Sequence, residues 1–161
     1  MMNKSTMFLA TAAALGVAMF PTQINEAARG LRNNNPLNIK EGSDGGAQWE
    51  GEHELDLDPT FEEFKTPVHG IRAGARILRT YAVKYGLESI EGIIARWAPD
   101  EENDTENYIN FVANKTGIPR NQKLNDETYP AVISAMIDME NGSNPYTYDE
   151  IKKGFEWGFY G

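Results

Sequence analysis

The segment from Pro130 to Tyr146 places the tightest constraint on how this chain folds. Its apolar residues recur at spacings of three and four, the period of one face of a buried helix: Val132, Ile133, Met136 and Met139. Glu140 follows in the last turn, and Asn141-Gly142 then forms the kind of left-handed C-cap that ends a helix. We therefore expect a core helix that carries a carboxylate at its C-terminal end.

Glu140 is the leading catalytic candidate because of this position. A carboxylate at the C-terminal end of a helix lies near the negative pole of the helix dipole and beside apolar side chains. Both effects disfavour the ionised form and raise the pKa, as a general acid working near neutral pH requires. The spacing alone also allows, and by itself favours, an ordinary surface Glu at a helix end.

The same segment resembles the catalytic helix of soluble lytic transglycosylases and goose-type lysozymes. In those enzymes an apolar helix ends in Glu-Ser-Gly and is followed by an aromatic-Asn-Pro turn. Here Glu140-Asn141-Gly142 precedes Asn144-Pro145, with Asn141 in place of the usual Ser. The family's helix comes first in the domain, whereas this one lies near the C-terminus. The resemblance thus implies a lysozyme-like fold that is rearranged or circularly permuted.

A second resemblance runs from about Arg29 to Phe155 and rests on an ordered series of short motifs. They are Arg29-Gly30-Leu31-Arg32-Asn33-Asn34-Asn35-Pro36-Leu37-Asn38-Ile39, Trp49-x-Gly51, Phe61-x-x-Phe64, Gly70-Ile71-Arg72-Ala73, Trp97-Ala98-Pro99, Glu102-Asn103-Asp104-Thr105 and Tyr108-Ile109. The series is similar to a family of phage and prophage cell-wall-degrading proteins. These look related to the virion-associated murein endopeptidase of enveloped double-stranded-RNA phages, which has a lysozyme-like fold.

Composition narrows the chemistry. The chain has 161 residues, enough for one domain with a modest core, and it has no Cys, so thiolate nucleophiles and Cys-based zinc sites are excluded. Only two His are present and no Gly-x-Ser-x-Gly occurs, which disfavours a Ser-His-Asp hydrolase. Carboxylates remain, and they suit glycosidic chemistry. The net charge of −9 argues against nucleic acid as a partner and requires a local groove for any anionic wall polymer.

Residues 1–28 predict a targeting segment. Lys4 is followed by an uncharged, Ala-rich run from Met7 to Phe20, and Pro21 ends it. This run has the length of a signal-peptide apolar region and is short for an ordinary membrane-spanning helix. We expect a signal peptide or signal anchor, through which the chain contacts a membrane, followed by one domain over residues 29–161. The alternative is a buried N-terminal helix.

Past this segment we expect mainly α structure with a small β-hairpin. Residues 53–58 alternate polar and apolar side chains and predict a half-buried strand, with a solvated acidic face rather than a metal site. Helical periods and end signals then predict four helices. They run from Pro67 to Gly86, from Ser89 to Ala98-Pro99, from Asp104 to Gly117, and up to Glu140. Thr147-x-x-Glu150 reads as a capping box that opens a last helix.

Other candidate site residues surround Glu140 in this scheme. Glu102 follows Trp97-Ala98-Pro99, where it can face a cleft or equally be a solvated residue of an acidic run. The family resemblance at Glu102-Asn103-x-Thr105 makes it the second catalytic candidate, and Glu26 is a third. We expect the substrate-binding residues to be aromatic rings that stack on sugars and amides that bond to N-acetyl groups, each of which can instead serve the core or the loop: Asn33, Asn34, Asn35, Asn38, Trp97, Tyr108, Asn141 and Tyr146.

The resemblances imply a peptidoglycan-degrading enzyme without a metal or organic cofactor. It would cut the β-1,4 bond between N-acetylmuramic acid and N-acetylglucosamine, as a muramidase or lytic transglycosylase does. The alternatives are a murein endopeptidase on the same fold and a non-catalytic virion structural or wall-binding protein. We expect phage virion proteins as further partners, and a location in the virion or, after export, in the periplasm or cell envelope.

Overall fold

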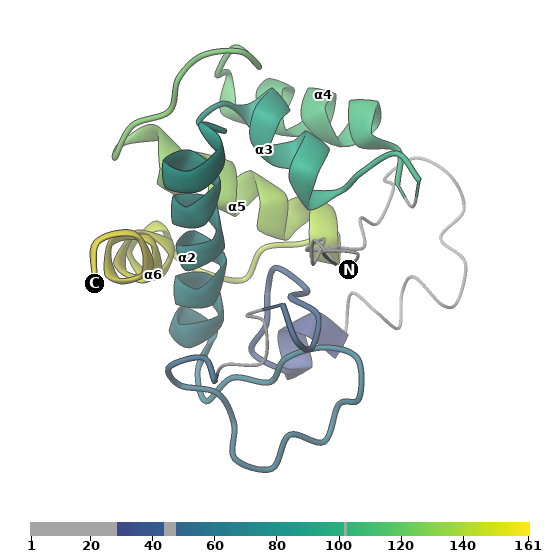
Figure 1. Ribbon diagram of the computed structural model, residues 1–161, viewed down its shortest axis with the longest axis vertical. Coiled ribbons are helices and arrows are strands. Elements are labelled where there is room, and N and C mark those ends of the chain that lie inside the picture. The colour runs from purple at the N-terminus through teal and green to yellow at the C-terminus, as the bar shows by residue number, and fades with distance from the viewer. Residues whose placement is uncertain (1–28, 44–47, 102) are drawn as a thin grey trace, which may run out of the picture.

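The computed structural model describes residues 29–43, 48–101 and 103–161. The targeting segment predicted for residues 1–28 and the candidates Glu26 and Glu102 lie outside the described residues. A helical turn at residues 29–32 opens the described part. The labelled helices are α2 (Pro67–Tyr85), α3 (Ile90–Trp97), α4 (Thr105–Thr116), α5 (Thr128–Asn141) and α6 (Tyr148–Tyr160) (Figure 1).

The helix ends predicted from the sequence are confirmed, because each rests on a local hydrogen bond. Ser89 and Asp104 accept the N–H groups that cap α3 and α4, and Thr147 and Glu150 form the capping box of α6. At the C-terminal ends, glycines in the left-handed conformation stop three helices at the predicted places: Gly86 after α2, Gly117 after α4 and Gly142 after α5.

Helix α5 lies at the centre and joins two helix pairs. It packs against α4, which packs on α3, and against α6, which packs on α2 (Figure 1). The four apolar residues that predicted it are all buried. Helices α2 and α6 approach closely because Gly154 and Gly158 face α2: a Cβ on Gly158 would lie 2.2 Å from the backbone oxygen of Arg72.

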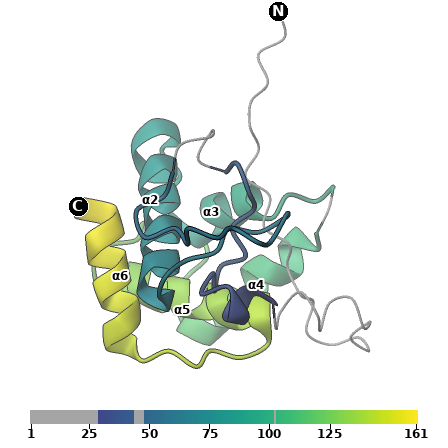
Figure 2. The same ribbon diagram turned by 90° about the horizontal axis from the view of Figure 1, so that it is seen from below.

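The segment between the helical turn and α2 is irregular. Its backbone pairing in the described residues is limited to isolated antiparallel bridges, Lys40 with Phe61 and Glu52 with Phe64. This segment lies beside the C-terminal end of α5 in both views (Figure 2). Asn38 of this segment contacts the Glu140 side chain there.

The strand predicted at residues 53–58, and with it the small β-hairpin, is wrong for the described residues. Leu55 and Leu57 are 65% and 74% exposed, so no core holds the apolar face of this segment. Asp56 has φ of 39°, which breaks an extended strand. The carboxylate of Glu63 accepts the N–H groups of Leu57 and Asp58, so these groups are not available to a neighbouring strand.

The mainly α fold class is confirmed. Over the residues that the structure describes, none of the helices is both long enough and apolar enough to cross a membrane.

Candidate functional site

Glu140 occupies the last turn of α5 and is 1% exposed. Its Oε1 accepts hydrogen bonds from the hydroxyl of Tyr108 at 2.9 Å and from Nε1 of Trp97 at 3.2 Å. Its Oε2 accepts a longer one from Nδ2 of Asn38 at 3.3 Å, and the same amide lies 3.4 Å from the Glu140 backbone oxygen. Four residues that the sequence marked separately thus meet at one carboxyl group.

Three separate elements bring the donors to Glu140. Trp97 is the last residue of α3, because Ala98-Pro99 ends that helix there. Tyr108 lies in the first turns of α4, which begins after the Asp104 cap. Asn38 belongs to the irregular segment and has φ of 49°, a left-handed conformation that Asn adopts more readily than most residues.

Asn38 also explains why residue 30 is glycine. A Cβ on Gly30 would lie 2.0 Å from Oδ1 of Asn38 and 3.1 Å from Oδ1 of Asn141, so any larger residue would displace both amides. Asn141 uses its Nδ2 to bond the backbone oxygens of Pro36 and Ile137, at 2.7 and 2.9 Å. The Oδ1 atoms of both Asn38 and Asn141 are buried and have no hydrogen-bond partner in the described part of the chain. The helical turn, the irregular segment and α5 are therefore joined around Glu140.

The electrostatics of this cluster are unusual for a core. A buried carboxylate is costly unless it is fully hydrogen-bonded. Burial, and next the charge of Glu140, raise the pKa of Tyr108 well above its usual value of 10, so this hydroxyl stays a donor at all ordinary pH values. A buried carboxyl group with specific hydrogen-bond partners is therefore a candidate functional group.

The rings of Trp97 and Tyr108 do not form the predicted sugar-stacking platform. Trp97 is 2% exposed and makes an edge contact with Tyr81, and Tyr108 is fully buried. Both reach Glu140 through their polar atoms, while their faces belong to the core. Stacking on a sugar requires an exposed face, so we correct their assignment to residues that orient Glu140.

The amides of the predicted Asn cluster mostly serve the backbone. Asn34 donates to the Phe64 oxygen, and Asn35 bonds the backbone of Ile39 and Glu62. These contacts fix the irregular segment, as local amide hydrogen bonds do in loops. Tyr146 is half-buried, and its backbone N–H donates to Asn144. The structure thus brings Asn38, but not Asn34 and Asn35, to the carboxyl group of Glu140, while Asn141 ties the end of α5 to the irregular segment.

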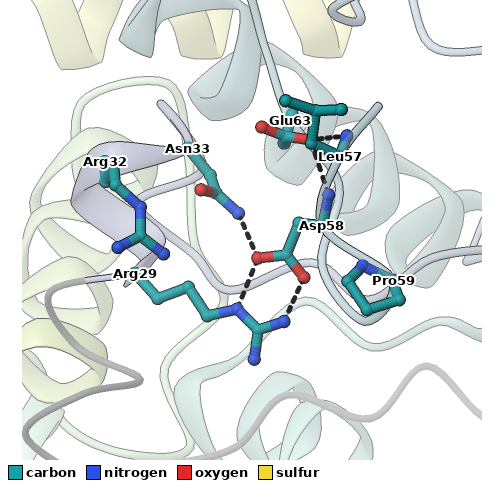
Figure 3. Close-up of a pocket in the computed structure, with 7 residues that line it drawn as sticks. All are labelled: Arg29, Arg32, Asn33, Leu57, Asp58, Pro59 and Glu63. Atoms are coloured by element: carbon teal, nitrogen blue, oxygen red, sulfur yellow. Dashed lines mark hydrogen bonds and ion pairs between the residues drawn. The ribbon is translucent and has the colours of Figure 1, made fainter. Parts of the chain in front are cut away.

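A pocket of about 600 Å³ lies between the helical turn and the loop at residues 57–63. Figure 3 shows its lining: Arg29, Arg32, Asn33, Leu57, Asp58, Pro59 and Glu63. Asp58 is held there by the guanidinium of Arg29, by Nδ2 of Asn33 at 2.7 Å, and by two backbone N–H groups. Burial opposes its charge, but these donors outweigh burial and lower the pKa of Asp58 well below its usual value.

Sequence reasoning missed Asp58 as a partner of Arg29 and Asn33. It placed Asp58 on the solvated face of a strand, whereas the residue is buried. The available signal was Arg29 and Arg32, spaced three apart at the start of the most specific motif. Nothing in that spacing indicates which of the many carboxylates pairs with either arginine.

A group of carboxylates lies elsewhere on the irregular segment. Partial burial raises the pKa of Glu41 to about 7, and the nearby charges of Asp56 and Glu52 act in the same direction. In the parts of the chain that the structure describes, no group of three or more His, Asp or Glu side chains is arranged to hold a metal ion.

These features describe a mainly helical protein with a buried, hydrogen-bonded carboxylate at the end of its central helix. No protein-family model matches the chain. It is 98% identical to Protein P5 of Pseudoalteromonas phage PM2 over 160 residues, which cover 99% of this chain and all of that protein. The chain belongs to the family of that phage protein, so the phage context expected from the sequence is supported.

Proposed function

We propose that the chain is a peptidoglycan-degrading enzyme with a lysozyme-like fold, and that Glu140 is its acid and base. The observation that carries the proposal is the set of donors that Trp97, Tyr108 and Asn38 direct at this carboxyl group. The resemblance of the α5 segment to the catalytic helix of lytic transglycosylases supplies the substrate class. In this proposal the enzyme acts on the wall at phage entry or lysis.

The proposed reaction begins when Glu140 protonates the oxygen of the bond between N-acetylmuramic acid and N-acetylglucosamine. Glu140 then accepts a proton from water, or from the C6 hydroxyl of the muramic acid, which gives a 1,6-anhydro product. One acid suffices if the acetamido group of the substrate stabilises the oxocarbenium-like transition state. Tyr108 and Trp97 hold Oε1 while the proton moves.

The substrate has to displace one of the groups that close over Glu140. Asn38 is the candidate, because its hydrogen bond to Oε2, at 3.3 Å, is longer than the bond from Tyr108 at 2.9 Å. It also lies in the irregular segment rather than in a helix. Displacement of Asn38 would open Oε2 to the glycosidic oxygen and leave Oε1 held by the two aromatic donors.

The burial of Glu140 favours a second candidate function, a non-catalytic virion or wall-binding protein. A carboxylate that is 1% exposed and bonded on both oxygens can join three elements without reacting. In that case the cluster around Glu140 would be a remnant of, or a substitute for, a catalytic site.

The test is digestion of purified sacculi with the wild-type chain and the Glu140→Gln variant, followed by mass spectrometry. We expect anhydro-sugar or reducing ends from the wild type, and a loss of about 10²–10⁴-fold in the variant. Glu127→Gln, at the exposed opposite end of α5, is the matched control and should retain full activity. New peptide termini would instead indicate an endopeptidase, and unchanged sacculi the non-catalytic protein.

The Glu140→Gln variant should fold, so that a loss of activity can be assigned to the missing carboxyl group. The amide nitrogen of a Gln at this position would oppose Nδ2 of Asn38, but rotation of the Asn38 amide presents Oδ1, which has no partner in the described structure. Tyr108 and Trp97 would keep donating to the remaining oxygen. Thermal unfolding of the variant should therefore stay close to that of the wild type.

A further inference from the structure

The pocket beside the helical turn contains a guanidinium group and a carboxylate oxygen that make no hydrogen bond or ion pair among the described residues. Arg29 and Asp58 neutralise each other, and Asn33 is committed to Asp58. Arg32 is exposed and has no hydrogen bond or ion pair in the described part of the chain. In a chain of net charge −9, an unpaired guanidinium in a pocket is a local point of attraction for anions.

The second group is Oε1 of Glu63. Its Oε2 accepts two backbone N–H groups, which fix the side chain, while Oε1 accepts none of the hydrogen bonds found among the described residues. Arg32 and Glu63 are not within ion-pair distance of one another, and Figure 3 shows them on different walls of the pocket. A ligand can therefore reach both without first breaking an ion pair.

Two residues of the mainly polar lining are apolar, Leu57 and Pro59. Leu57 is 74% exposed, and Pro59 beside it is exposed as well. Together the lining offers a cation, an anion and a short apolar surface, within a volume of about 600 Å³. These features fit the end of an aliphatic α-amino acid, with its carboxylate on the guanidinium and its ammonium on the carboxylate.

We propose that this pocket binds the zwitterionic end of the diamino acid in a peptidoglycan stem peptide, with Arg32 holding its carboxylate and Glu63 its ammonium group. The choice of ligand rests on the proposed function, because the wall supplies such a group on every stem that is not cross-linked. The pocket would anchor the peptide while the glycan approaches Glu140. It would also give an acidic protein a local means of binding an anionic polymer.

The test is a calorimetric titration of the full-length protein with the tripeptide L-Ala-γ-D-Glu-meso-diaminopimelate. A second tripeptide with L-Lys in the third position lacks the terminal carboxylate and should bind roughly tenfold more weakly. Arg32→Ala should weaken binding of the first peptide by about the same factor and leave binding of the second unchanged. Glu63→Gln keeps the acceptor for the two N–H groups but removes the charge, so it should weaken both.

Arg79→Ala is the matched control, because Arg79 is an exposed arginine of α2 outside the pocket lining. Equal effects of Arg32→Ala and Arg79→Ala, or equal binding of the two peptides, would overturn the proposal. The outcome is separable from the fate of the proposed function. Peptide binding that depends on Arg32, in a protein without wall-cleaving activity, would support the peptide-binding proposal and refute the proposed catalysis. Wall-cleaving activity without such binding would support the catalysis and refute the peptide-binding proposal.

Discussion

At the scale of single residues, the most consequential feature is that two aromatic side chains serve the core and a carboxylate together. Tyr108 and Trp97 bury their rings and direct their polar atoms at Oε1 of Glu140. Loss of either contact would leave an acceptor oxygen that is removed from water with one donor fewer, which is costlier than losing an exposed hydrogen bond. The two donors also fix where the carboxyl group points, which a catalytic acid needs.

Tyr108→Phe isolates the contribution of the shorter of the two hydrogen bonds to Oε1 of Glu140. The ring and its packing remain, while Oε1 of Glu140 loses the donor at 2.9 Å. We expect the free energy of unfolding to fall by about 1–3 kcal/mol, measured by urea unfolding at pH 7. Tyr148→Phe is the control, since Tyr148 is 53% exposed, and it should change stability little. Equal stability of the two variants would show that the hydrogen bond to Glu140 adds nothing to folding.

At the scale of elements, the sequence predicted most helices because their ends are local. Caps such as Ser89 and Thr147 bond an N–H group three residues away, so the residues involved are visible in a short window. The strand predicted at residues 53–58 is wrong because its conformation depends on contacts outside the segment. Its alternating pattern is real, but its backbone is held by Glu63 and no sheet lies beneath Leu55 and Leu57.

The contact between α2 and α6 gives a prediction at this scale. Gly158→Ala would place a Cβ 2.2 Å from the Arg72 oxygen and 2.8 Å from the Ala75 Cβ, so the two helices would have to separate. We expect a loss of roughly 1–3 kcal/mol in the free energy of unfolding, as for overpacking elsewhere. The measurement is denaturant unfolding monitored by circular dichroism.

Gly92→Ala, in α3, is the matched substitution. Its Cβ would meet the end of the Leu87 side chain at 3.3 Å and lie in ordinary contact with the Ser89 Oγ at 3.5 Å, and Ala has the higher helix propensity. This variant should be as stable as the wild type or more so. If Gly158→Ala behaved in the same way, the close approach of α2 and α6 would not be a requirement of the fold.

At the scale of the whole molecule, the candidate site depends on contacts that no local pattern encodes. Asn38 and Glu140 are 102 residues apart, and Asn141 and Pro36 are 105 apart. The sequence marked Glu140 and Asn38 by resemblance to known motifs, and it predicted correctly where α5 ends. It left open whether the rings of Trp97 and Tyr108 face the core or a sugar, since that depends on how α3 and α4 pack over α5.

Asp58 is expected to set the acid stability of the whole fold, because its carboxylate ties the helical turn to the loop at residues 57–63. Its pKa is lowered in the folded protein, so its contribution is complete above the unfolded value of about 4 and is lost as the pH falls below that value. Asp58→Asn should therefore cost up to roughly 3–5 kcal/mol between pH 5 and 8, since it removes the ion pair with Arg29.

The gap in the free energy of unfolding between wild type and Asp58→Asn should narrow steadily as the pH falls below about 4, because the unfolded wild-type chain then binds a proton at Asp58 while the folded protein, in which the pKa of this carboxyl group is lowered, still holds it ionised. Urea unfolding of both proteins at each pH from 2 to 8 measures this convergence. Asp100→Asn, at an exposed position after α3, should follow the wild type throughout. A gap that stayed constant down to pH 2 would mean that the charge of Asp58 is not what stabilises this region. The shape of Asn at that position, rather than the lost ion pair with Arg29, would then account for the cost.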